Sequence, residues 1–236
     1  MIHDVQFSDE RWLQFWENFK GLEHQIKNIV KLGEQIKQAD PCLLTEGAEW
    51  VQGYKAQQQA ALVRNPLAVK WQSQLDNKSG TGYRECFSSS CAMLAMYWGK
   101  VPQGDDAYNA IRAKFGDTTS AEAQLTALRS LGLKADFHTS GTPRALEEEI
   151  DAGRPVAVGW LHKGPVGAPS GGGHWSVVIG YTAAAWIQND PNGEALLAQG
   201  GYTPKTKGAG VVYSRKNWNP RWMPGGSGGW YLTCRP

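Results

Sequence analysis

Among the residues of this 236-residue chain, Cys86 is the best placed for nucleophilic chemistry. It comes directly before the apolar run SSSCAMLAMYWG at 88–99, which predicts a helix that begins with small hydroxyl residues and ends at Gly99. Free backbone N–H groups at the start of a helix favour a thiolate, and a thiolate attacks carbonyl carbon atoms. Cys91 is the alternative, but it falls inside the apolar run, where we expect a buried and inert thiol.

A nucleophilic thiol needs a base, and His174 is the best candidate. It follows three glycines and opens the apolar run HWSVVIGY, which predicts an imidazole at the end of a strand, on the rim of a sheet. The other histidines have different settings: His3 and His24 in the N-terminal segment, His138 in a short strand-like piece and His162 in a glycine-rich loop.

A third residue commonly orients the base, and Asp190 can do so. It ends the run AAWIQND, and Pro191 stops the strand behind it. A carboxylate there can accept the imidazole N–H and stabilise the charged ring. Asn189 is the alternative, because adjacent strand residues point to opposite faces and only one of the two can reach His174. The sequence leaves this choice open.

A helical half and a sheet are needed to bring these residues together. Helices are predicted near 105–115, at 120–131 with Thr119 and Glu122 at capping-box spacing, and from Thr142 to Gly153. Apolar or alternating runs separated by Gly, Pro and Asn predict strands, namely LAVKW, PVAVGWL, HWSVVIGY, AAWIQND, GVVYS and GWYLTC. Helices that come mostly before the strands indicate an α+β fold.

Residues 1–64 differ from the rest and are predicted to form a separate helical arm or hairpin, with the boundary at Arg64, Asn65 and Pro66. Apolar residues recur at spacings of three and four from Trp12 to Ile36, as in a coiled coil or a docked helix. Residues 8–36 therefore pack either on the same chain or on a partner.

Composition excludes several classes of protein. The 24 basic and 22 acidic residues nearly cancel and form no basic tract, so nucleic acid is not an expected partner. The acidic N-terminus is unlike a signal peptide, and no apolar run is long enough to span a membrane. The four cysteines, Cys42, Cys86, Cys91 and Cys234, have the spacing of neither a disulfide scaffold nor a zinc site, and we expect no metal or cofactor.

The run from Cys86 to Gly99, CFSSSCAMLAMYWG, resembles the segment CGPTSLAMVLAYYG of C39-like papain-fold cysteine peptidases, without a gap. GRPVAVGW, GGHWSVVIGY and WIQNDPNG are similar, in the same order, to later strands of that family, and the likeness covers about residues 67–236. It implies a papain-like α+β fold in which a helical half packs on an antiparallel sheet. The C39-like domain would occupy 65–236, and the helical arm 1–64.

The resemblance also implies roles for individual residues. It places Cys86 at the nucleophile position, with His174 as base and Asp190 as its orienting partner. Gln74 matches the glutamine that donates a hydrogen bond to the oxyanion formed on attack, for which a neutral amide is suited. Gln72 is the alternative, because Gln74 lies further from the nucleophile in sequence than in many relatives.

Two aromatic residues are expected to bind the substrate. Phe87 stands at a position where many members of the C39-like family have glycine, and Trp175 follows the candidate base, His174. Aromatic faces suit peptides or sugars. The family pattern therefore implies an aromatic cleft whose shape differs from that of many relatives.

Together these residues predict a cysteine endopeptidase that cleaves amide bonds through an acyl-enzyme on Cys86. The closing segment NWNPRWMPGGSGGWYL resembles the tails of C39-like proteins encoded by bacteriophages. That likeness implies a peptidoglycan substrate and an enzyme made in the cytoplasm and delivered to the cell wall, as a virion component or for lysis, with virion proteins as partners of residues 8–36. Simple packing of Trp218, Trp222 and Trp230 on the sheet is the alternative for this segment. The alternative functions are a structural tail or baseplate component and an acyl transferase.

Overall fold

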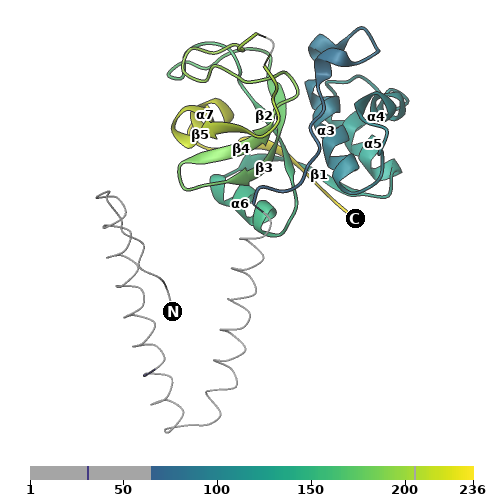
Figure 1. Cartoon of the computed structure of the whole chain (residues 1–236), viewed down its shortest axis with the longest axis horizontal. Coiled ribbons are helices and arrows are strands. Elements are labelled where there is room, and N and C mark those ends of the chain that lie inside the picture. The colour runs from purple at the N-terminus through teal and green to yellow at the C-terminus, as the bar shows by residue number, and fades with distance from the viewer. Residues whose placement is uncertain (1–30, 32–64, 205) are drawn as a thin grey trace, which may run out of the picture. The chain divides into compact units, whose positions relative to one another are not determined.

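The computed structural model describes residues 31, 65–204 and 206–236. The predicted arm, with its stripe at 8–36, lies outside the described residues except for Lys31, so its helices stay a prediction. All the described residues from 65 onward belong to one compact unit. Figure 1 shows the helices within residues 86–130 gathered on one side of this unit, whereas the helices at 143–151 and 215–222 lie with the strands on the other.

Two 3-10 turns and five α-helices are described in this unit. They are the 3-10 turns η1 (Gln74–Asp76) and η2 (Gly82–Arg84), followed by α3 (Cys86–Tyr97), α4 (Asp105–Arg112), α5 (Ala121–Ser130) and α6 (Pro143–Asp151), and finally α7 (Arg215–Trp222). Within the described part of the chain, every helix is too short or too polar to span a membrane.

A six-stranded antiparallel sheet forms the other half, with strand order β1-β6-β2-β3-β4-β5. The strands are β1 (Lys134–Gly141), β2 (Val156–Trp160), β3 (His174–Tyr181), β4 (Ala185–Asn189), β5 (Val211–Ser214) and β6 (Gly229–Arg235). The β2/β3 register pairs Trp160 with His174, so the imidazole lies at the end of a central strand. The α+β, papain-like prediction is confirmed.

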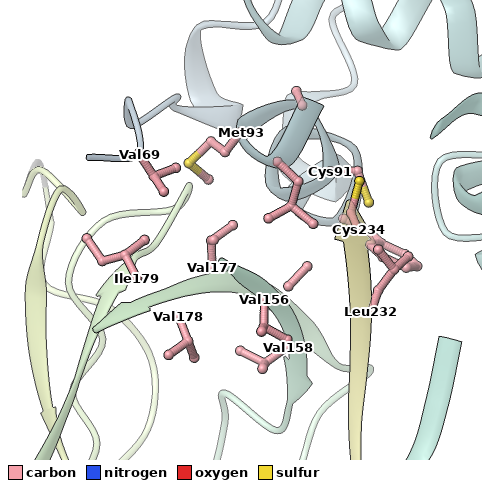
Figure 2. Packing of buried hydrophobic residues seen from close by; sticks show 14 of the residues in the cluster. Val69, Cys91, Met93, Val156, Val158, Val177, Val178, Ile179, Leu232 and Cys234 are labelled. Atoms are coloured by element: carbon pink, nitrogen blue, oxygen red, sulfur yellow. The ribbon is translucent and has the colours of Figure 1, made fainter. Parts of the chain in front are cut away.

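The core lies between α3 and the sheet. Every residue of α3 from Phe87 to Ala95 is buried, so this helix is enclosed on all sides, which explains why its sequence holds apolar and small residues and no charged ones. Figure 2 shows Met93 and Cys91 of α3 above Val177 of β3 and near Cys234 of β6. Because buried side chains hold α3 on the sheet, the start of the helix is fixed relative to the strand ends.

The helix ends mostly follow the predicted signals. Thr142 caps α6 by accepting a hydrogen bond from the Ala145 N–H at 3.2 Å. The predicted capping box at Thr119 is wrong, because Ser120 caps α5 and accepts from the Ala123 N–H at 3.2 Å. Thr119 instead bonds back to Asp117.

Two other segments differ from the prediction. LAVKW at 67–71 forms no strand. The Leu67 N–H donates to the Ile179 carbonyl at 2.7 Å, but the Val69 N–H then turns back to the Leu67 carbonyl, so no strand ladder continues. The closing segment contains α7, which the sequence did not predict because Pro220 lies inside it. Trp218 and Trp222 stack on each other in the core at 5.3 Å, as the packing alternative predicted.

Candidate active site

Cys86 is the first residue of α3 and lies at a cleft of about 730 Å³ between the helical half and the sheet. Its side chain is partly exposed. Cys91, one and a half turns further on, is completely buried, and burial raises the pKa of its thiol well above the ordinary value. Exposure at the cleft therefore separates the two thiols as the sequence predicted.

His174 also lines this cleft and is paired with Asp190. Its Nε2 lies 2.8 Å from Asp190 Oδ1, and both side chains are almost completely buried. The Trp160 ring meets the imidazole edge to face, with ring centroids 5.3 Å apart. Because Nε2 is used by Asp190, Nδ1 is the nitrogen left to interact with the Cys86 thiol.

The electrostatics of this pair favour a protonated imidazole. Burial by itself lowers the pKa of His174, but the charges and hydrogen bonds of Asp190 and Cys86 outweigh burial and raise that pKa to about 10. Cys86 and His174 line the same cleft. An imidazolium beside a thiol is the arrangement that stabilises a thiolate.

The Asp190 carboxylate is held by several donors besides the imidazole. Oδ1 accepts the Asn192 N–H at 2.9 Å, and Oδ2 accepts the Tyr213 hydroxyl at 2.9 Å and the Tyr202 hydroxyl at 3.4 Å. Burial, followed by the negative charge of Asp190, raises the pKa of both phenols, so they stay protonated donors. These contacts fix the carboxylate against His174.

Asn189 points elsewhere. Its Nδ2 donates to the Val69 carbonyl at 2.8 Å, and its Oδ1 accepts the Gly210 N–H at 2.9 Å. Both ends of the amide therefore hold loops in place. Of the two adjacent candidates, the structure brings Asp190 to His174.

Gln74 is buried at the edge of the same cleft. Its backbone N–H donates to the Pro191 carbonyl at 2.9 Å, which ties it to the segment that carries Asp190. Its Nε2 donates to the Gly82 carbonyl at 2.9 Å, and the second N–H of that nitrogen remains for another acceptor. Gln72 instead accepts from the Asp105 N–H at the start of α4 and does not line the cleft.

Phe87 and Trp175 form one wall of the cleft. Their rings stack at 3.7 Å with an interplanar angle of 5°. Phe137 lies 5.9 Å from Trp175 and 6.0 Å from Trp230, so the aromatic row continues to Trp230, which is 55% exposed at the open end. In the described part of the chain no Asp or Glu lines this cleft, whereas Arg84 and Arg221 do.

Some residues of the site were not found from the sequence. Two of them, Tyr202 and Tyr213, bind Asp190. The others are Arg221 of α7 and His162, whose ring centroid lies 5.7 Å from that of His174. Each comes from a segment far from Cys86 in sequence and carries no local motif. The described residues contain no group of three or more His, Cys, Asp or Glu side chains that could hold a metal.

Comparison with known proteins places this site in a family. The model of the Peptidase C39 like family matches residues 66–218. None of the curated proteins matches this chain.

Three solved structures are similar to the chain. A protein described as a C39-like peptidase from Bacillus anthracis has a TM-score of 0.51 and 16% identity, over 72% of this chain and 95% of that one. The peptidase domain of Streptococcus ComA, a bi-functional ABC transporter involved in quorum sensing, has a TM-score of 0.48 and 19% identity, over 71% and 98%. A double glycine motif protease from an AMS/PCAT transporter, in complex with a leader peptide, has a TM-score of 0.44 and 20% identity, over 71% and 93%.

The similarity to the Bacillus anthracis protein concerns the fold alone. The family match is independent of it and spans more than half of the sequence, from before η1 into α7. Both findings agree with a papain-like arrangement of helix and sheet. The chain belongs to the Peptidase C39-like family.

Proposed function

We propose that this chain is a cysteine endopeptidase that cleaves amide bonds in the peptide part of peptidoglycan, at cross-links or stem peptides, with Cys86 as its nucleophile. The pairing of buried His174 with Asp190, beside a partly exposed thiol at the start of a helix, is the observation that carries this proposal. Membership of the Peptidase C39-like family also supports the cleavage of peptides.

In the proposed reaction the Cys86 thiolate attacks the carbonyl carbon of the substrate, and the carbonyl oxygen takes the negative charge. The Cys86 backbone N–H and the second N–H of Gln74 Nε2 stabilise this oxyanion. The tetrahedral intermediate collapses when imidazolium His174 gives its proton to the leaving amine, which leaves an acyl-enzyme. Water, deprotonated by His174, then attacks the thioester and releases the acid and the thiol.

The cleft lining supports a peptidoglycan substrate. Peptides of the cell wall carry free carboxylates and are attached to sugar rings. The described lining of the cleft contains no Asp or Glu side chain that would repel such a peptide, and it includes Arg84, which also pairs with Asp117 at 2.9 Å. The exposed face of Trp230 and the Phe87–Trp175 stack suit sugar rings or the apolar parts of a peptide.

The direct test compares purified wild-type protein, Cys86→Ala and Cys91→Ala on purified bacterial peptidoglycan, by measuring the release of free amines. Cys86→Ala should lose the activity, whereas Cys91→Ala should keep it with a modest loss of stability, because the buried thiol only fills space. Equal amine release from wild type and Cys86→Ala would refute the proposal.

Delivery to the cell wall as part of a virion, or release for lysis, completes the proposal. The segment proposed to bind virion proteins, residues 8–36, lies outside the described residues apart from Lys31. Its support is the heptad-like stripe in the sequence. A pull-down of tail proteins by residues 1–64 fused to an inert carrier would test this part separately from catalysis, and no capture would contradict it.

A further inference from the structure

A second histidine, His162, lies at the cleft beside the candidate base. It follows β2 in the chain and lines the same cleft as Cys86 and His174. Its ring centroid is 5.7 Å from that of His174 and 5.9 Å from that of Tyr202. None of the reaction steps above uses it.

Arg221 of α7 holds the backbone around His162. Its buried guanidinium donates to the carbonyls of Leu161, Lys163 and Gly164 at 3.0, 3.2 and 2.7 Å. The His162 carbonyl itself accepts the Gly201 N–H at 2.8 Å. A buried cation that binds only carbonyls fixes the path of this loop, so the backbone that carries His162 is held in place before any ligand enters.

The His162 side chain has hydrogen-bonding capacity that the described residues do not use. Its Nδ1 is buried without a partner among them, whereas Nε2 makes no hydrogen bond to them and is not fully buried, so Nε2 is the nitrogen that a ligand in the cleft can reach. Burial, then the charges of His174 and Lys163, lower the pKa of the ring to about 4. At neutral pH the ring is therefore uncharged, with one N–H donor and one acceptor nitrogen.

We propose that His162 is a substrate-positioning residue, whose neutral imidazole forms a hydrogen bond with a backbone amide of the bound peptide next to the scissile bond. This inference rests on the peptidase function proposed above. A peptide backbone presents both N–H and C=O groups, and an uncharged imidazole can pair with either. A neutral ring also adds no positive charge that would compete with the imidazolium of His174.

The test separates peptide binding from thiol reactivity by using two reagents on the full chain. Iodoacetamide alkylates a reactive thiol and is too small to reach along the cleft, whereas an epoxysuccinyl dipeptide must bind in the cleft before it alkylates. Rates of Cys86 modification by both would be measured by mass spectrometry for wild type, His162→Phe and His162→Gln. His138→Phe is the matched control, because His138 lies on β1, bonds to Thr233 and does not line the cleft.

In His162→Phe we expect the rate with the epoxysuccinyl dipeptide to fall roughly fivefold to tenfold, as for one lost hydrogen bond, while the iodoacetamide rate stays within about twofold. His162→Gln, which keeps a donor and an acceptor, should recover most of the lost rate. His138→Phe should match wild type with both reagents.

Three results would overturn the inference. Equal dipeptide rates in wild type and His162→Phe would show that the ring makes no contact with the peptide. A parallel fall in both rates would show that His162 acts on the thiol or on folding. If wild-type Cys86 reacts with neither reagent, the proposed function itself fails. This result differs from the first two, which contradict only the role of His162.

Discussion

At the residue scale, the protonation of His174 depends on two neighbours, the Asp190 carboxylate and the Cys86 thiol. Asp190 in turn depends on Tyr213, Tyr202 and the Asn192 N–H, which together satisfy a carboxylate that has no access to solvent. The proposed chemistry thus rests on hydrogen bonds that run from Tyr213 through Asp190 to the His174 imidazole, which lines the same cleft as Cys86.

The first prediction concerns the alkaline limit of activity. The pKa of His174 is raised to about 10, so kcat/KM for peptide cleavage should stay high well above neutral pH and fall as the pH approaches 10. Asp190→Asn removes the negative charge and should move this limit down by about one unit or more. A pH–rate profile measures both, and an alkaline limb at the same pH in the two proteins would contradict the role of Asp190.

A second prediction concerns stability and pH. Folded His162 has a pKa lowered from 6.5 to about 4, so between these values the unfolded chain binds more protons and stability rises with pH. Folded His174 has a pKa raised from 6.5 to about 10, so above 6.5 the folded state keeps a proton that the unfolded chain loses, and stability falls.

The free energy of unfolding in urea, measured at several pH values from acid to alkaline, should therefore pass through a maximum. His162→Phe should flatten the rising side and leave the falling side unchanged. Burial also raises the pKa of carboxylates such as Asp105. Subtracting the free energy of unfolding of one protein from that of the other at each pH removes this shared contribution. Parallel curves for the two proteins would show that His162 is not kept neutral by the fold.

At the element scale, α7 and β6 meet at one close contact that shapes the end of the cleft. A Cβ atom on Gly229 of β6 would overlap the Trp222 ring of α7. Trp222 is buried, stacks on Trp218 and donates its indole N–H to the Trp230 carbonyl at 2.9 Å, so it has no room to move. Only glycine allows this approach of strand and helix.

The third prediction follows from this contact. Gly229→Ala should lower the free energy of unfolding by about 1–3 kcal/mol, because the core would be overpacked. Gly225→Ala in the neighbouring loop is the matched control, since its Cβ would meet nothing within 4 Å, and it should change stability by less than about 0.5 kcal/mol. Urea unfolding of both variants measures the difference, and equal stabilities would contradict the described packing.

At the scale of the whole molecule, the cleft lies where the two halves of the peptidase unit meet. Cys86 and Gln74 come from the helical half, His174 and Asp190 from the sheet, and the halves are joined by the core around α3. The backbone N–H groups of Leu67 and Gln74 also donate to the carbonyls of Ile179 and Pro191, which connects residues 67–74 to the sheet side. The site therefore depends on the packing of this unit as a whole.

The fourth prediction is that residues 65–236 fold and cleave without residues 1–64. The described core lies entirely within residues 67–234, so removal of the arm should leave cooperative unfolding and amine release from peptidoglycan unchanged. Chromatography with light scattering and the cleavage assay measure these properties. A truncated chain that aggregates or loses cooperative unfolding would show that the arm belongs to the core.

Much of the site follows from local patterns in the sequence. The apolar run after Cys86 predicted α3, and the glycines before His174 together with the alternating runs predicted strands β2 to β6, because burial and turn chemistry leave clear local signals. The sequence did not predict α7, because Pro220 lies inside it and proline normally indicates that a segment is not helical. The apolar run LAVKW predicted a strand that does not form, because an apolar run can be buried against a sheet without joining its strand ladder.

The sequence by itself determined which residue types could act and in what order along the chain: a thiol at a helix start, an imidazole at a strand start and an acid or amide at the next strand end. Only the tertiary structure decided that Asp190 rather than Asn189 meets His174, that Tyr213 donates to Asp190, and that Arg221 and His162 line the cleft. These choices depend on strand register and on contacts between residues far apart in the chain, for which local spacing carries no signal.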